Sequence, residues 1–185
     1  MSQTRSLAHS LLVGLAGGLA GLAVMGWAMK LSQRWLPPPK DEEDAQTQTR
    51  RGLQRRESIS LIGKHYRDNE PATDALGRLL YERATGHEPS AQTQERLSNA
   101  AHRAYGLGVA SLYAALRPKR VPGWQSGLAY GLGLWALGDE LAVPLLGLSK
   151  NPLRHPLQSH ASALVGHLAY GATVGVTLDL LERRL

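Results

Sequence analysis

Charged residues are absent from four long stretches of this 185-residue chain. Each stretch is apolar, rich in glycine and long enough to form several helical turns. A bilayer core of about 30 Å is crossed by about 20 helical residues rising ~1.5 Å each. The pattern therefore predicts membrane-spanning helices. The charge-free stretches cover residues 6–29, 104–116, 121–138 and 156–178.

The four stretches predict an all-α fold, an integral membrane four-helix bundle. Residues typical of helix caps and turns set the boundaries of its helices. The bundle consists of two tandem helical hairpins and forms a single membrane domain over the whole chain. The charged segment 30–96 is predicted to be an extramembrane connector with a short helix at about 74–85, capped by Thr73 and ended by Gly86. Ser90 is the predicted N-cap of the helix that leads into the second span. The predicted spans cover about residues 7–29, 97–116, 124–148 and 160–181.

The charge balance favours the lipid bilayer as partner and excludes nucleic acid. The net charge is +6, but the basic residues neither follow one helix face nor alternate with aromatic residues. Short basic segments at Arg5, 117–120 and 183–184 are typical of cytoplasmic loops. We therefore expect a multi-pass protein of the bacterial inner membrane with both termini in the cytoplasm.

Glycines recur at four-residue spacing in the apolar stretches. In lipid, small residues at this spacing let two helix backbones approach closely. The spacing leaves open whether the partner helix lies in the same chain, in a second copy within a homo-oligomer, or in a larger membrane complex. The pairs predicted to pack helices are Gly14 with Gly18, Gly127 with Gly131, and Gly171 with Gly175.

A His-x-Ala-Tyr-Gly motif occurs twice, at residues 102–106 and 167–171, which predicts two copies of one hairpin. In such a bundle, both motifs lie at the depth of the two carboxylates in the third span. A carboxylate costs on the order of 2.5 to 3.5 kcal/mol at the centre of a span, so these groups are expected to face inward and find partners. The predicted polar cluster consists of His102, Tyr105, Asp139, Glu140, His167 and Tyr170.

Three interpretations of this cluster remain open. It forms a buried hydrogen-bond network, or a proton- or ion-responsive site, or a cofactor site in which His102 and His167 ligate haem or a metal. The chain has no cysteine, which excludes thiolate ligands and nucleophiles, and it carries no catalytic motif, so we expect no enzymatic activity. Asp179 is expected to be a solvated, inert carboxylate. His155 and His160 are candidates for headgroup binding or pH sensing, against the ordinary explanation of a charged interfacial loop.

Three short motifs carry a resemblance to a known family. Two lie in the last third of the chain, PLLGLSKNP at 144–152 and GHLAYG at 166–171, and the third is RWLPPPK at 34–40. Together they resemble the YagU-like family of small bacterial inner-membrane proteins. The resemblance covers residues 124–184 and the end of the first span, and it implies a multi-span inner-membrane protein. The chain departs from the family pattern because no acidic residue precedes the proline run and the connector is unusually charged. The family-pattern positions are Pro144, Gly147, Pro152 and His167.

Overall fold

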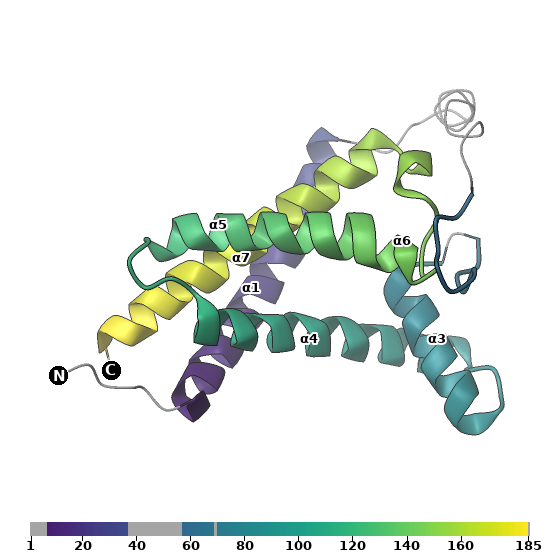
Figure 1. The fold of residues 1–185 in the computed structure, drawn as a ribbon, viewed down its shortest axis with the longest axis horizontal. Helices are drawn as coiled ribbons and strands as arrows, with labels where there is room; N and C mark the ends of the chain where they lie inside the picture. Colours follow the sequence, from purple (N-terminus) through teal and green to yellow (C-terminus); the bar gives the residue numbers. More distant parts are fainter. Residues whose placement is uncertain (1–6, 37–56, 69, 185) are drawn as a thin grey trace. The chain divides into compact units, whose positions relative to one another are not determined.

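The computed structural model describes residues 7–36, 57–68 and 70–184, and Figure 1 draws them as a ribbon. The described residues contain helices and no strand, which confirms the all-α class. A long helical segment covers each charge-free stretch. Prolines 37–39 and residues 40–56 of the connector lie outside the described residues. The helices are α1 (Leu7–Trp35), α3 (Ala72–Thr85), α4 (Ala91–Leu116), α5 (Gly123–Gly133), α6 (Val143–Leu145) and α7 (Leu157–Arg184).

Helix α3 ends where the sequence predicts and begins two residues earlier. Gly86 is in the left-handed region at φ 72°, and its N–H donates to the carbonyl four residues before it. The prediction that Thr73 caps the helix is wrong, because Pro71 occupies the N-cap position. The fixed φ of proline suits a helix start, and the Thr73 hydroxyl accepts a hydrogen bond from Ser98 instead.

The start of α4 follows its predicted cap. The Ser90 hydroxyl accepts a hydrogen bond of 3.3 Å from the N–H of Thr93, which satisfies one of the N–H groups that have no partner inside the helix. The Ser90 hydroxyl also lies 2.9 Å from that of Thr93. This confirms Ser90 as the N-cap.

The third predicted span is not a regular α-helix. Helix α5 continues directly into a π-helix at Leu134–Ala142, then into the short α6, and Gly147 at φ 69° ends the helical path. Pro144 supplies a physical reason, because a proline ring clashes with the carbonyl four residues earlier in an α-helix, here that of Glu140. A wider π turn moves that carbonyl away. Rare π segments are often found at functional sites, and this one carries both carboxylates of the predicted cluster.

The chain divides into two compact units. Unit 1 comprises residues 1–36, 104–135 and 161–185, and unit 2 comprises residues 37–103 and 136–160. The division at residue 104 coincides with the start of the second charge-free stretch. Unit 1 therefore collects most of the apolar sequence, and unit 2 collects the described part of the charged connector.

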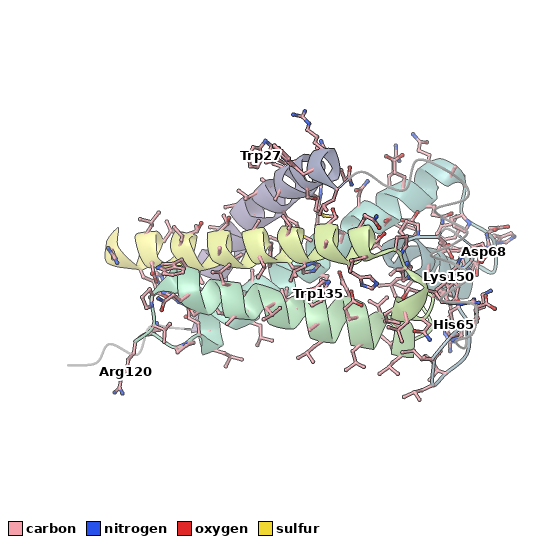
Figure 2. The ribbon with its side chains drawn as sticks, turned by 90° about the horizontal axis from the view of Figure 1, so that it is seen from above. Trp27, His65, Asp68, Arg120, Trp135 and Lys150 are labelled. Atoms are coloured by element: carbon pink, nitrogen blue, oxygen red, sulfur yellow. The ribbon has the colours of Figure 1, made fainter. Side chains whose placement is uncertain are left out.

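Unit 1 exposes large apolar side chains and buries small and polar ones. Leu12, Trp27 and Leu116 are 66%, 66% and 72% exposed, and Figure 2 shows Trp27 projecting from α1. Four serines of the unit are buried: Ser32, Ser111, Ser126 and Ser162. The apolar part of the interior consists of Val13, Met25, Ala110, Tyr113, Ala114, Tyr170, Val174 and Leu178.

Helices α5 and α7 meet backbone to backbone inside unit 1. A methyl group built on Gly127 would clash with the carbonyl oxygen of Gly171, and one built on Gly171 would lie 2.7 Å from the nitrogen of Gly131. Gly175 faces Gly123 in the same way. The interface contains glycines because any side chain there would hold the two helices apart.

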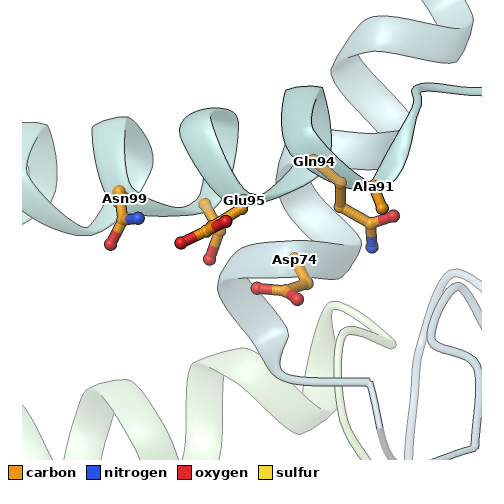
Figure 3. Close-up of a pocket in the computed structure, with 6 residues that line it drawn as sticks. Asp74, Ala91, Gln94, Glu95 and Asn99 are labelled. Atoms are coloured by element: carbon orange, nitrogen blue, oxygen red, sulfur yellow. The ribbon is translucent and has the colours of Figure 1, made fainter.

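Unit 2 is held together by a buried ion pair between the connector and α3. The Arg78 guanidinium donates to Glu70 at 2.8 and 2.9 Å and to the carbonyl of His65 at 2.7 Å. Both side chains of the ion pair are 6% exposed. The hydrogen bonds from Arg78 hold the pKa of Glu70 below its usual value, against the opposing effect of burial. Beside α3, an open cleft of about 470 Å³ is lined by Ala91 and by five polar residues (Figure 3): Asp74, Gln94, Glu95, Ser98 and Asn99.

Two of the described helices are long and apolar enough to cross a membrane. They cover residues Ala8–Trp35 and Leu157–Arg183. Core helices of soluble proteins and signal sequences can have the same length and composition. These two helices by themselves are therefore a weak indication of a membrane protein.

Candidate functional site

The predicted polar cluster is divided between the two units. Tyr105, His167 and Tyr170 belong to unit 1, and His102, Asp139 and Glu140 belong to unit 2. The second copy of the repeated motif is buried: His167 is 8% exposed and Tyr170 is 2% exposed.

Both buried residues form hydrogen bonds with helix backbones. The Tyr170 hydroxyl donates to the carbonyl of Gly106, linking α7 to α4. The Nδ1 atom of His167 lies 2.9 Å from the carbonyl oxygen of Ala163, and because a carbonyl only accepts, Nδ1 carries the hydrogen. His167 Nε2 is therefore the nitrogen that can accept a hydrogen bond or ligate a metal.

The first copy of the motif has a different environment. His102 is exposed, and Tyr105 is 52% exposed. The two copies of the motif therefore differ in burial. Helical spacing places residues on a shared face, but it does not determine which face the neighbouring helices cover.

The structure pairs Glu140 with a histidine that lies outside the predicted cluster. Glu140 Oε1 lies 2.6 Å from Nδ1 of His160, which is in the second turn of α7. The other ring nitrogen, Nε2, lies 2.9 Å from the carbonyl oxygen of Pro152. Both side chains are largely buried, with 24% of Glu140 and 22% of His160 exposed. Asp139, the neighbouring carboxylate, is exposed.

Satisfying both contacts of the His160 ring requires one additional proton. A neutral imidazole carries one N–H, but here both ring nitrogens face oxygen atoms, and an ionised carboxylate and a carbonyl only accept. A neutral His160 beside an ionised Glu140 can satisfy only one of the two contacts. Either an imidazolium donates to both oxygens, or a protonated Glu140 donates to the neutral ring. In both cases the pair holds one additional proton.

His155 is the second histidine of this site. Its ring lies edge-on to that of His160, with 6.1 Å between the centroids. Burial lowers the pKa of His155, and positive charge on His160 lowers it further. Glu140 opposes the shift and Lys150 adds to it. His155 therefore favours the neutral state.

The sequence predicts that Glu140 needs a partner but does not pair it with His160. The short turn between the third and fourth apolar stretches could have indicated this pairing. The end of one stretch and the start of the next reach the same edge of a hairpin, so residues beside the turn lie close together. Glu140 and His160 both lie close to that turn. The sequence motif at His167 drew attention to a position farther along the helix.

The described residues contain no group of three or more histidine, cysteine, aspartate or glutamate side chains placed to hold a metal ion.

The six glycines predicted to pack helices all contact other helices of unit 1. A methyl group on Gly14 would lie 2.5 Å from the Cα atom of Ser111, and one on Gly18 would lie 3.0 Å from the Leu107 side chain. Gly127, Gly131, Gly171 and Gly175 lie in the α5–α7 interface described above.

Asp179 is half-buried and paired rather than free in solvent. It accepts a hydrogen bond of 2.6 Å from Arg117 and one of 2.7 Å from the backbone N–H of Gly123. The Arg117 side chain is 3% exposed and also pairs with Glu182 at 3.1 Å. These contacts fasten the loop between α4 and α5 to the end of α7. The expectation for Asp179 is wrong because a buried arginine requires a counter-charge.

No known protein family matches this sequence, and no characterised protein or solved structure is significantly similar to it.

Proposed function

We propose that this chain is a proton-responsive, multi-span protein of the bacterial inner membrane, without enzymatic activity. Glu140 and His160 bind and release the proton. The observation that carries this function is the pair of short contacts at His160, 2.6 Å to Glu140 and 2.9 Å to the carbonyl of Pro152. A neutral ring beside an ionised carboxylate cannot satisfy both.

Support for a membrane location comes from unit 1. In a soluble protein the large apolar side chains lie inside, and a contiguous exposed apolar surface needs a partner. Leucines and tryptophans lie on the outside of unit 1, while four serines, Tyr113 and Tyr170 are buried. This distribution suits a lipid environment, in which helices associate through small residues and hydrogen bonds rather than through the hydrophobic effect.

Support for the orientation comes from the basic residues. The ion pairs of Arg117 with Asp179 and Glu182 bring the basic α4–α5 loop and the basic end of α7 together. A shared location on the cytoplasmic side agrees with the distribution of positive charge in membrane proteins.

The bound proton controls how the segment 149–156 is held. His160 Nε2 donates to the Pro152 carbonyl, which also accepts from the backbone N–H of His155 at 3.0 Å. The N–H of Asn151 donates to the carbonyl of Glu57 at 3.0 Å, which ties the same segment to the connector. Loss of the proton removes one hydrogen bond from His160 and loosens the segment.

The test is hydrogen exchange of the full-length protein in liposomes, measured at pH 5 and pH 8 and expressed as protection relative to the intrinsic rates. We expect the protection of residues 149–156 to fall about tenfold at the higher pH, since a hydrogen bond to a charged group contributes about 1.5 kcal/mol. In Glu140→Gln the step should vanish and protection should remain high. The glutamine amide donates to a neutral ring and its oxygen accepts from a charged one.

The matched control is Asp139→Asn, which removes the neighbouring exposed carboxylate. It should keep the wild-type pH step. Equal pH steps in the wild type and Glu140→Gln would refute the proton-responsive pair. Failure of the wild-type protein to float with liposomes would refute the membrane location.

A further inference from the structure

A basic pocket lies at one end of unit 1. It has a volume of about 330 Å³ and is formed by the α4–α5 loop and the C-terminal turns of α7. Figure 2 shows Arg120 projecting from the loop. The lining contains four basic and two acidic side chains and therefore carries excess positive charge. The residues are Arg117, Lys119, Arg120, Val121, Pro122, Asp179, Glu182 and Arg183.

The two carboxylates do not neutralise the four cations. Asp179 and Glu182 both pair with the buried Arg117, and Lys119 reaches only Glu182, at 3.6 Å. Arg120 and Arg183 are exposed and form no ion pair with any described residue. Two arginine side chains at the mouth of the pocket are therefore available to an anion.

Arg117 provides a second, independent observation. Its side chain is 3% exposed, and its Nε atom is buried with no hydrogen-bond partner within the described residues. A buried donor without an acceptor costs about 1 to 3 kcal/mol. The unpartnered N–H adds partial positive charge beneath the pocket lining and so favours an anion there.

Apolar side chains adjoin the basic ones. Leu116 and Trp124 flank the loop and are 72% and 52% exposed, and Val121 in the pocket lining is 38% exposed. A tryptophan beside basic residues is typical of the depth at which lipid headgroups lie. A soluble phosphate needs no such apolar border, whereas a phospholipid places its phosphate in the pocket and its acyl chains beside these side chains.

We propose that this pocket binds the phosphate of an anionic phospholipid such as phosphatidylglycerol, with Arg120 and Arg183 as its principal contacts. The site rests on the proposed membrane location and is independent of the Glu140–His160 pair. Guanidinium groups suit this role because they form paired hydrogen bonds with phosphate oxygens.

Trp124 reports on this site directly. In a full-length background carrying Trp27→Phe, Trp35→Phe and Trp135→Phe, its fluorescence is measured in bilayers that contain brominated phosphatidylglycerol or brominated phosphatidylcholine as quencher. We expect stronger quenching by the anionic lipid. Loss of both arginines should lower the relative affinity roughly 25-fold, since each basic residue near an anionic surface contributes about fivefold.

The pocket variant is Arg120→Gln with Arg183→Gln, and its charge-matched control is Arg83→Gln with Arg96→Gln in unit 2. The control should keep the preference for phosphatidylglycerol. Equal quenching by both lipids, or an equal loss in the control, overturns the site. Displacement of the lipid by millimolar inorganic phosphate overturns the choice of lipid over a soluble phosphate ligand. No quenching by either lipid refutes the membrane location instead.

Discussion

Gly171→Ala tests the direct contact between α5 and α7. A methyl group on Gly171 would lie 2.7 Å from the nitrogen and 2.9 Å from the Cα atom of Gly131, and it would clash with the carbonyl oxygen of Gly127. All three atoms belong to the backbone, so no rotamer change relieves the contact. Ordinary contact begins at 3.4 Å, so the helices must separate by at least about 0.7 Å.

The expected loss of stability is a difference between two effects. Overpacking by one methyl group in a close-packed interior costs typically ~1 to 3 kcal/mol, and a rigid backbone contact is at the upper end of that range. Replacing glycine by alanine within a helix gains roughly 0.5 to 1 kcal/mol. We therefore expect Gly171→Ala to lower the free energy of unfolding by about 2 kcal/mol.

Gly133→Ala in α5 is the matched control, because a methyl group there meets no atom within 4 Å. It should be neutral or stabilise by up to about 1 kcal/mol. Unfolding of both variants in detergent micelles, followed by circular dichroism, measures the difference. If Gly171→Ala proves as stable as Gly133→Ala, the two backbones are not in contact.

Three further predictions concern the loop, the connector and the α7 ion pair. Gly147→Ala should destabilise the protein by more than the roughly 1 to 2 kcal/mol that a non-glycine residue costs in the left-handed region, because its methyl group would also clash with the Gly63 carbonyl. Gly86→Ala is the control, since Gly86 is also left-handed but has open space around it. Equal shifts in melting temperature for the two variants would contradict this prediction. The pKa of Glu70 is lower in the folded protein than its ordinary value of 4.5. Its ion pair therefore stabilises unit 2 fully when the pH is above 4.5, and this contribution is lost as the pH falls below 4.5 toward the lowered pKa. Acid titration followed by circular dichroism should show a milder loss in Glu70→Gln, and an unchanged acid transition would refute the reasoning. Asp179→Asn should lower the free energy of unfolding by about 2 kcal/mol, because it leaves the buried Arg117 with one carboxylate fewer. The detergent unfolding assay measures this loss. A change below ~0.5 kcal/mol would mean that the ion pair contributes little to stability.

Local signals in the sequence predicted helices and several of their ends. Gly86 ends α3 because a left-handed residue is needed there, and Ser90 caps α4 because its hydroxyl reaches the first turn. Thr73 failed as a cap because Pro71 occupies that position. The π-helix was not predicted, since hydrophobic pattern does not distinguish a π turn from an α turn.

The candidate site was predicted in part. The cost of a carboxylate in an apolar stretch identified Glu140 as a residue that needs a partner, and the structure places one 2.6 Å away. The partner is His160 rather than a histidine of the repeated motif. Side-chain pairing between helices depends on their rotation and on the path of the loop, and neither is encoded in the spacing of one helix.

The sequence by itself determined which segments are helical and which positions are apolar, small or charged, because these follow from local backbone preferences and from the partition of charge between water and apolar surroundings. Tertiary structure alone decided which face of each helix is covered. It buried Tyr170 and left Tyr105 exposed although both belong to the same motif. It also gave Asp179 a buried arginine partner and placed the glycines of α5 against those of α7. These outcomes depend on contacts between residues far apart in the chain, and such contacts form only when the helices have packed.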